Sequence, residues 1–385
     1  MFMTCRNHFL MIIKNQSVFH HHTCSYQVPT WASHLKNIPR KRIKLAMLPT
    51  PVQKWNIKGI PDGIEVFVKR DDMTGSTLSN KVRKLEFLLA DAVTQGCGSV
   101  ITCGGLQSNH CRATAVAARE LELDCHLFLR ANETNVNFLD SAGNLLPSLL
   151  CNSHIYLIPK FSKYKVDIAP KQELLASQIK KKSGKSAYCI PVGGSSGVGV
   201  FGYIEAWEEL ITRQNVMKKY DDIVVACGSG GTIAGLAIGN YLTGEKLKVH
   251  GITVCDNKDY FHSHVNEMLD TLGITETRSQ NIVDIIDGYK GAGYGQSTFE
   301  DHEFYKSIAH DTGIICDPVY TGKALKGMLT ELHNNKNRFQ GSRILFIHTG
   351  GIFSLYDGRI TSQLKNIWLK NTYRWRQNAA EPEKI

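Results

Sequence analysis

Residues 222–242 read DIVVACGSGGTIAGLAIGNYL and contain the pattern that decides the fold. An apolar run typical of a buried strand enters a glycine-rich turn, and a stretch typical of a helix follows. A strand, such a turn and a helix start together present backbone N–H groups and a positive helix-dipole end to an anion. We therefore expect a phosphate-binding turn here. Its members are Gly228, Ser229, Gly230, Gly231 and Thr232.

Two common nucleotide-binding motifs do not fit this turn. A P-loop needs a lysine directly after its last glycine, and no lysine follows here. The dinucleotide fingerprint G-x-G-x-x-G begins correctly at Gly228 but has Ile233 at its final glycine position. A tight strand-to-helix turn without a ligand is the alternative for this loop taken alone.

The alternation of apolar runs with helical stretches extends along most of the chain. It predicts an α/β protein with mostly parallel sheets. Strands are expected at 99–104, 125–130, 154–159, 187–192, 222–228, 248–254, 313–318 and 343–351. Helices are expected from about 80 to 95 and at 110–123, 201–214, 232–242 and 322–333. The strands form two groups that separate near 193–199, which predicts two lobes.

The net charge of +10 suggests nucleic-acid binding, but its location argues against it. Nine Lys and Arg residues and no acid lie within residues 1–61. The remainder has 36 basic and 35 acidic residues, so the body of the protein is nearly neutral. No run of about 18 apolar residues predicts a membrane span. We expect neither a nucleic-acid nor a membrane partner.

The first 28 residues are free of acidic side chains and precede the first fold-like segment. They are predicted to be a mitochondrial leader or a disordered tail, and the protein to be mitochondrial or cytoplasmic. The 11 cysteines form no C-x-x-C pair, and several lie inside apolar runs. Buried free thiols in a reducing compartment fit this better than a metal site, so no metal is expected.

A basic run opens one predicted helix. Residues 78–87 read LSNKVRKLEF, and apolar residues recur from Val82 at helical spacing. Lys81 lies at the first turn of this helix and can point away from its body. Lys84 is expected on the solvent-exposed surface, whereas the sequence does not decide whether Arg83 is exposed or buried.

The combination of these features predicts a cofactor. A phosphate cup without a P-loop lysine, a lysine that opens a distant helix and the Asn- and Ser-containing loop 103–112 suit pyridoxal 5′-phosphate. That cofactor needs a lysine amine, a phosphate cup and a partner for its ring nitrogen.

Five segments resemble a known family. They read KRDDMTGSTLSNKVRKLEFLLADA, ITCGGLQSNHCRA, VVACGSGGTIAGL, DPVYTGKALKGM and LFIHTGG, in this order. They are similar to D-cysteine desulfhydrases and 1-aminocyclopropane-1-carboxylate (ACC) deaminases. Both are enzymes that use pyridoxal phosphate and have the two-domain fold type II, like the tryptophan synthase β subunit. The resemblance runs from about Arg42 to about Asp357 and implies a homodimer.

The resemblance implies a domain division and cofactor contacts. Residues 29–83 and 193–385 would form the larger, cofactor-binding domain, and 84–192 the smaller α/β domain. Lys81 would be the Schiff-base lysine, and Asn109 would bind the ring hydroxyl. Residues 228–232 would hold the phosphate. Thr321 would face the pyridine nitrogen, and Thr349 would close the ring side.

It also implies a substrate side. Catalysis would involve Lys81, Ser108, Tyr294 and Tyr320. Substrate would be bound by Asn80, Gln107, Ser108 and His110. Ser108 and Asn109 could equally cap the helix that follows them.

The position after Tyr320 favours one reaction within the family. ACC deaminases have an acid there, whereas this chain has Thr321. An acid strengthens the electron sink that ring opening needs, whereas α,β-elimination of a thiolate tolerates a threonine. We therefore expect D-cysteine to give pyruvate, hydrogen sulfide and ammonia. ACC deamination, D-serine dehydration and racemisation are the alternatives.

The chain departs from the family pattern at one place. The family has Ser-Gly-Asn-Lys before the helix, and this chain has only Ser79-Asn80-Lys81. Loss of one residue shifts a chain by up to about 3.5 Å unless the turn re-forms. A catalytically impaired protein is therefore a further alternative.

Overall fold

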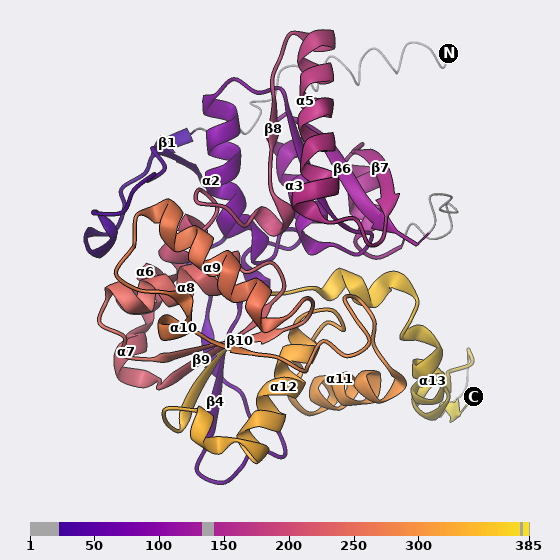
Figure 1. Ribbon diagram of the computed structural model, residues 1–385. Coiled ribbons are helices and arrows are strands. Elements are labelled where there is room, and N and C mark those ends of the chain that lie inside the picture. The colour runs from indigo at the N-terminus through magenta and orange to yellow at the C-terminus, as the bar shows by residue number, and fades with distance from the viewer. Residues whose placement is uncertain (1–22, 133–141, 378–379, 385) are drawn as a thin grey trace, which may run out of the picture.

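The computed structural model describes residues 23–132, 142–377 and 380–384 and contains two main sheets (Figure 1). The larger sheet has the strand order β11-β10-β9-β12-β4-β3, and all neighbours are parallel except β3 and β4. Its strands are β3 (Val52–Lys54), β4 (Glu65–Lys69), β9 (Asp222–Cys227), β10 (Lys248–Thr253), β11 (Asp284–Ile286) and β12 (Arg343–Ile347).

The smaller sheet has the order β7-β6-β5-β8 and is entirely parallel. Its strands are β5 (Ser99–Gly105), β6 (Asp124–Ala131), β7 (His154–Pro159) and β8 (Ala187–Cys189). The predicted α/β class with parallel-rich sheets is confirmed. The exact domain boundaries stay a prediction.

Helices cover both sheets. In the part carrying the smaller sheet they are α2 (Lys81–Thr94), α3 (Asn109–Glu120), α4 (Leu145–Leu150) and α5 (Ala169–Ser183). In the rest they are α6 (Phe201–Gln214), α7 (Val216–Lys219), α8 (Gly231–Leu242), α9 (Lys258–Leu272), α10 (Ser279–Ile282), α11 (Phe299–Thr312), α12 (Thr321–Asn334) and α13 (Lys365–Asn371). The five predicted helices form within one or two residues of their expected starts.

Strand β9 shows why an apolar run becomes a central strand. Ile223 and Val225 pack into one cluster with α6, α8 and α9. Val224 and Ala226 face the opposite side and pack into a second cluster with α11 and α12. Successive side chains point to opposite faces, so a strand covered on both sides must be apolar throughout.

One expected strand is wrong. Residues 313–318 form a loop, because Gly313 ends α11 in a left-handed conformation with φ of 69°. The Asp317 carboxylate then accepts the backbone N–H groups of Val319, Tyr320 and Thr321. A side chain thus takes the place of a neighbouring strand as hydrogen-bond partner and turns the chain into α12.

Residues 23–28, the last six of the segment expected to be a leader or tail, belong to the folded body of the protein. Strand β1 (Thr23–Ser25) pairs antiparallel with β2 (Lys41–Ile43). The Tyr26 hydroxyl donates to Glu205 at 2.8 Å, and its ring packs edge-on against Phe87. Residues 1–22, where the leader is otherwise expected, lie outside the described residues.

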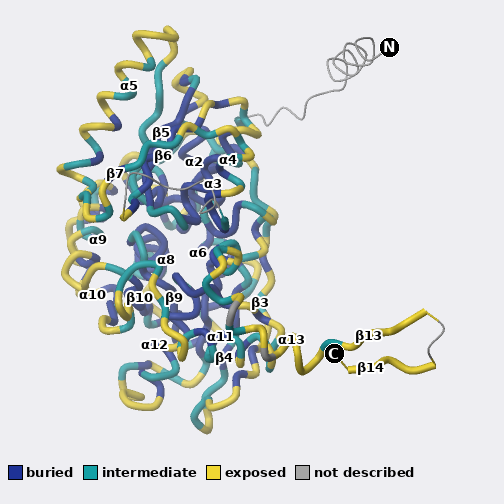
Figure 2. The backbone as a smooth tube through the Cα atoms, turned by 90° about the vertical axis from the view of Figure 1, so that its right-hand side faces the viewer, coloured by how far each residue is buried: buried dark blue, intermediate teal, exposed yellow. Residues whose placement is uncertain are grey.

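The C-terminal segment extends away from the body of the protein (Figure 2). It consists of α13 and a short antiparallel pair, β13 (Tyr373–Arg374) and β14 (Glu383–Lys384). No helix within the described residues is long and apolar enough to cross a membrane.

A buried histidine joins three strands of the larger sheet. His250 on β10 lies 2.8 Å from Asp222 on β9 and 2.9 Å from Asp284 on β11. Burial opposes its charge, but the two carboxylates outweigh burial and the pKa of His250 is raised. The pKa of Asp284 falls to about 2, since His250 and Arg338 outweigh its burial.

We expect His250 to make stability depend on pH. Its contribution is fully present below about pH 6.5, the ordinary histidine pKa, and is lost as the pH rises through the raised value of the folded state. The free energy of unfolding should therefore fall above about pH 6.5. In His250→Asn this part of the slope should disappear, which urea unfolding at a series of pH values measures. An unchanged slope would contradict this assignment.

Candidate active site

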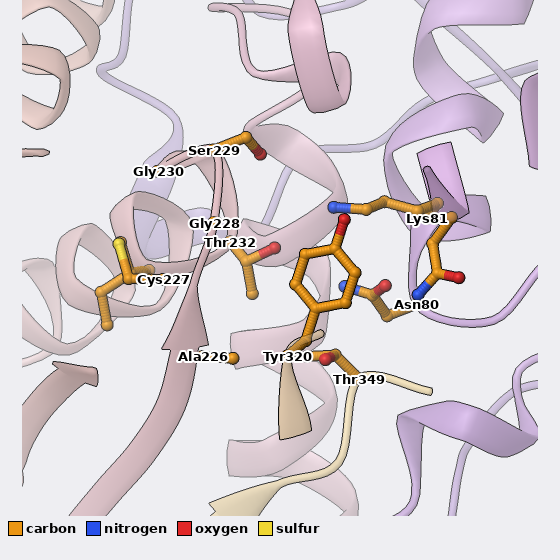
Figure 3. A pocket seen from close by; sticks show the side chains of 12 residues that line it. Asn80, Lys81, Ala226, Cys227, Gly228, Ser229, Gly230, Thr232, Tyr320 and Thr349 are labelled. Atoms are coloured by element: carbon orange, nitrogen blue, oxygen red, sulfur yellow. The ribbon is translucent and has the colours of Figure 1, made fainter. Parts of the chain in front are cut away.

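A pocket that is partly open to solvent lies where β9 ends and where α2 and α8 begin (Figure 3). Nine of the predicted site residues line it: Asn80, Lys81, Asn109, Gly228, Ser229, Gly230, Thr232, Tyr320 and Thr349. Ala226, Cys227 and Ile233 complete the lining.

The glycine-rich turn leaves room for a ligand where side chains would fill it. Gly230 has φ of 84°, which favours glycine. A Cβ at Gly231 would lie 2.7 Å from Ser195 Oγ and 2.8 Å from Lys84 Nζ. The turn leads directly into the N-terminus of α8, where backbone N–H groups attract an anion.

Lys81 is the first residue of α2, and its amine extends into the pocket toward Tyr320 (Figure 3). Burial lowers the pKa of Lys81 to about 8. A lysine with this pKa has an appreciable uncharged fraction near neutral pH. It can therefore act as a nucleophile or accept a proton.

The turn before Lys81 closes without a glycine. Ser79 takes the left-handed conformation itself, with φ of 49°, which is uncommon for a residue with a side chain. Gly350 makes room for it, since a Cβ on Gly350 would lie 2.6 Å from Ser79 Cβ. The shortened turn thus still places Lys81 in the pocket.

We expect a glycine inserted between Ser79 and Asn80 to change pyridoxal phosphate affinity by less than about threefold, because Ser79 already supplies the turn geometry. Spectroscopic titration of the purified protein with the cofactor would measure this. A much larger gain in affinity or turnover would mean that the shortened turn holds Lys81 out of place.

Lys84 corrects an expectation and adds a site residue. It was expected at the surface but is 1% exposed, and its amine donates to Gly193 O and Ser195 Oγ at 3.2 and 3.3 Å. Burial, and then the neighbouring charge of Lys81, holds its pKa well below the ordinary value. Lys81 and Lys84 are three positions apart and therefore share one side of the helix. This spacing is the feature of the sequence that could have indicated that Lys84 belongs to the site.

The residues present fit a phosphate ester. The buried amine of Lys84 lies at the glycine-rich turn, Lys81 lines the same pocket, and no acidic residue is among those that line it. Ser195 adds a hydroxyl that donates to Ser229 and accepts from the N–H of Gly231. Buried amines and helix N–H groups without a carboxylate favour an anionic ligand, which would in turn stabilise the charged form of the amines. Pyridoxal phosphate is such a ligand and offers Lys81 an aldehyde.

Two tyrosine hydroxyls meet beside the pocket. Tyr294 and Tyr320 form a short hydrogen bond to each other, and the Tyr294 ring lies against Gly105. Burial raises the pKa of both hydroxyls well above the ordinary value. Both therefore keep their protons at neutral pH and are suited to donate.

Besides Gly231 and Tyr294, four predicted site residues do not line the pocket. Ser108 caps α3 and accepts the N–H of Cys111 at 3.2 Å. Gln107 bonds to Ala142 and to the backbone of Asn144. His110 is buried with Nε2 2.9 Å from Thr102 Oγ1. The capping alternative for Ser108 is thus realised.

Thr321 is the fourth. Its hydroxyl donates to Asp317 at 2.7 Å and accepts the Asp317 N–H at 2.8 Å. This hydroxyl is therefore committed to the start of α12. Its predicted contact with a pyridine nitrogen stays a prediction, as do the substrate contacts of Gln107, Ser108 and His110.

Behind the pocket, Arg83 forms a buried ionic network. It donates to both oxygens of Asp71 at 2.8 and 2.9 Å and to Glu209 at 3.0 Å. Glu209 is also paired with Lys69. All four side chains are at most 9% exposed, so Arg83 belongs to the interior rather than to the surface.

Comparisons with known proteins agree with this chemistry. The sequence profile described as "Pyridoxal-phosphate dependent enzyme" matches residues 43–350. The chain belongs to this family. The cofactor predicted from the sequence is confirmed.

Relatives within the family cover most of the chain and confirm the specific resemblance predicted from the sequence. It is 47% identical to the Arabidopsis thaliana "Bifunctional D-cysteine desulfhydrase/1-aminocyclopropane-1-carboxylate deaminase, mitochondrial", over 86% of this chain and 83% of that one. It is 35% identical to a D-cysteine desulfhydrase of Salmonella typhi, over 84% and 97%. The crystal structure of an ACC deaminase homologue superimposes with a TM-score of 0.73 and 33% identity, over 89% and 100%.

Proposed function

We propose that the protein is a carbon–sulfur lyase that converts D-cysteine and water into pyruvate, hydrogen sulfide and ammonia. Two similar proteins carry the name D-cysteine desulfhydrase, alone or together with ACC deaminase. The observation that carries the choice of reaction is the absence of an acidic residue from the pocket lining, together with Thr321 after Tyr320.

Bound pyridoxal phosphate supplies an electron sink for the carbanion that forms when a substrate loses its α-proton. Lys84, the glycine-rich turn and the N-terminus of α8 would hold its phosphate. Lys81 would hold its aldehyde, and the Lys81 amine would accept the α-proton of the substrate. The protonated Tyr294–Tyr320 pair would donate a hydrogen bond to the departing sulfur. These residue roles are part of the proposal.

The acid-free lining supports elimination over ring opening. A carboxylate beside the ring nitrogen would keep it protonated and deepen the sink. Here the carboxylate that contacts Thr321, that of Asp317, is committed to backbone N–H groups and to the Thr321 hydroxyl. D-Cysteine has an α-proton to remove and a good leaving group, whereas ACC has no α-proton.

A substrate panel tests the proposal. The purified protein loaded with cofactor is incubated with D-cysteine, L-cysteine, D-serine and ACC, and sulfide, pyruvate and 2-oxobutyrate are measured. We expect sulfide and pyruvate in equal amounts from D-cysteine. Release of 2-oxobutyrate from ACC at a comparable kcat/KM would make the protein bifunctional. Turnover of D-serine without D-cysteine would overturn the proposal.

ACC deamination is the second candidate, because the Arabidopsis relative carries both names. We also propose a homodimer and a mitochondrial location. The dimer is the arrangement implied by the family resemblance, and the location follows from the acid-free N-terminal segment and the mitochondrial relative. Light scattering and a fluorescent fusion of the full chain test these two points.

A further inference from the structure

A chain of hydrogen bonds leads from the ionic network to the pocket. Asn80 lines the pocket next to Lys81, and its Nδ2 donates to the Tyr203 hydroxyl at 3.1 Å. The Tyr203 hydroxyl donates to Asp71 Oδ2 at 3.0 Å. Asn80, Tyr203 and Asp71 are at most 2% exposed, so water does not compete for these bonds.

The direction of these bonds is fixed by the charged end. Burial opposes the charge of Asp71, but Arg83 outweighs it, and the pKa of the carboxyl is lowered. An ionised carboxylate can only accept hydrogen bonds, so the Tyr203 hydroxyl donates its single O–H to Asp71. Burial, and then Asp71, raises the pKa of Tyr203 well above the ordinary value, so the proton stays on the hydroxyl.

The oxygen of Tyr203 can then only accept from Asn80. A rotated Asn80 amide would place two acceptors against each other in a buried site, which is unfavourable. The amide nitrogen is therefore turned inward, and Oδ1 is the polar atom left for the pocket.

We propose that Asp71 and Tyr203 are positioning residues that fix the Asn80 amide with its carbonyl oxygen available to the pocket beside Lys81. Such an acceptor binds an N–H group and rejects a carboxylate. The group it receives is an N–H of the Lys81 nitrogen. The inference needs the family cofactor alone and does not rest on the proposed substrate.

A double-mutant cycle tests the proposal. Tyr203→Phe removes one oxygen and frees the Asn80 amide, while Asp71 stays held by Arg83 and by Thr50 at 2.8 Å. We expect affinity for pyridoxal phosphate to fall about fivefold, the effect of one hydrogen bond, and the visible absorption maximum of the bound cofactor to shift. In the Asn80→Ala background Tyr203→Phe should alter neither quantity further.

A purely structural role predicts a different pattern. The melting temperature would fall in both backgrounds, and any loss of affinity from Tyr203→Phe would persist in Asn80→Ala. That additive result would overturn the proposal. An unshifted absorption maximum together with unchanged affinity in Tyr203→Phe alone would overturn it as well.

Tyr188→Phe is the matched control. Its hydroxyl also donates to an aspartate, Asp91 at 2.8 Å, but near the far end of α2. We expect it to leave the affinity and the absorption maximum unchanged. Because none of these readouts uses D-cysteine, the inference and the proposed substrate can fail independently.

Discussion

Replacing Lys81 with alanine abolishes the absorption band of the lysine-bound cofactor and lowers pyruvate release at least about 10³-fold. Lys81 extends from the start of α2 into the pocket, and burial brings its pKa to about 8. No other described lysine lines the pocket. An absorption spectrum of the purified variant with added pyridoxal phosphate, and a lactate-dehydrogenase-coupled assay, measure the two effects.

Two outcomes would contradict this assignment. If the band persists in Lys81→Ala, another amine forms the bond, and Lys84 is the nearest candidate because it also reaches the glycine-rich turn. If Lys180→Ala, a change at an exposed lysine on α5, has the same effect, then the loss is not specific to the pocket.

Replacing Arg83 with methionine should cost about 3–5 kcal/mol of stability. Methionine fills a similar volume but leaves the carboxylates of Asp71 and Glu209 in the interior without their main partner. Lys69 compensates only one of the two charges. Urea unfolding followed by tryptophan fluorescence measures the loss.

Arg278→Met is the matched control for this change. Arg278 pairs with Asp270 at 2.5 Å, but both side chains are about half exposed. Exposed pairs contribute about 0–1 kcal/mol, so the control should unfold close to the parent protein. Equal losses in the two variants would mean that the Arg83 network adds no more stability than a surface pair.

Much of the fold was predictable because its signals are local. The apolar runs of β5, β6, β7 and β9 and the helical periodicity of α2 and α6 can be read within about ten residues. The loop at 313–318 could not be predicted in this way. Its apolar residues resemble a strand, but the bonds that Asp317 makes to later N–H groups decide its conformation.

The site was predictable where residue type limits the chemistry. The residue types of a glycine-rich turn and of a lysine at a helix start already indicate their chemical roles, and both line the pocket. Lys84 and Arg83 were harder, because a charged residue in sequence predicts a surface. Their burial depends on distant partners, Ser195 for one and Glu209 for the other, which only the folded chain brings near.

The first turns of α2 have a consequence for how this sequence can change over time. Residues 82–90 are all buried, and their charged members each have a dedicated partner. In α5, by contrast, only Gln172 is buried. Single substitutions can therefore accumulate in α5 with little loss of stability. In α2 a charged residue can change only when its buried partner changes with it.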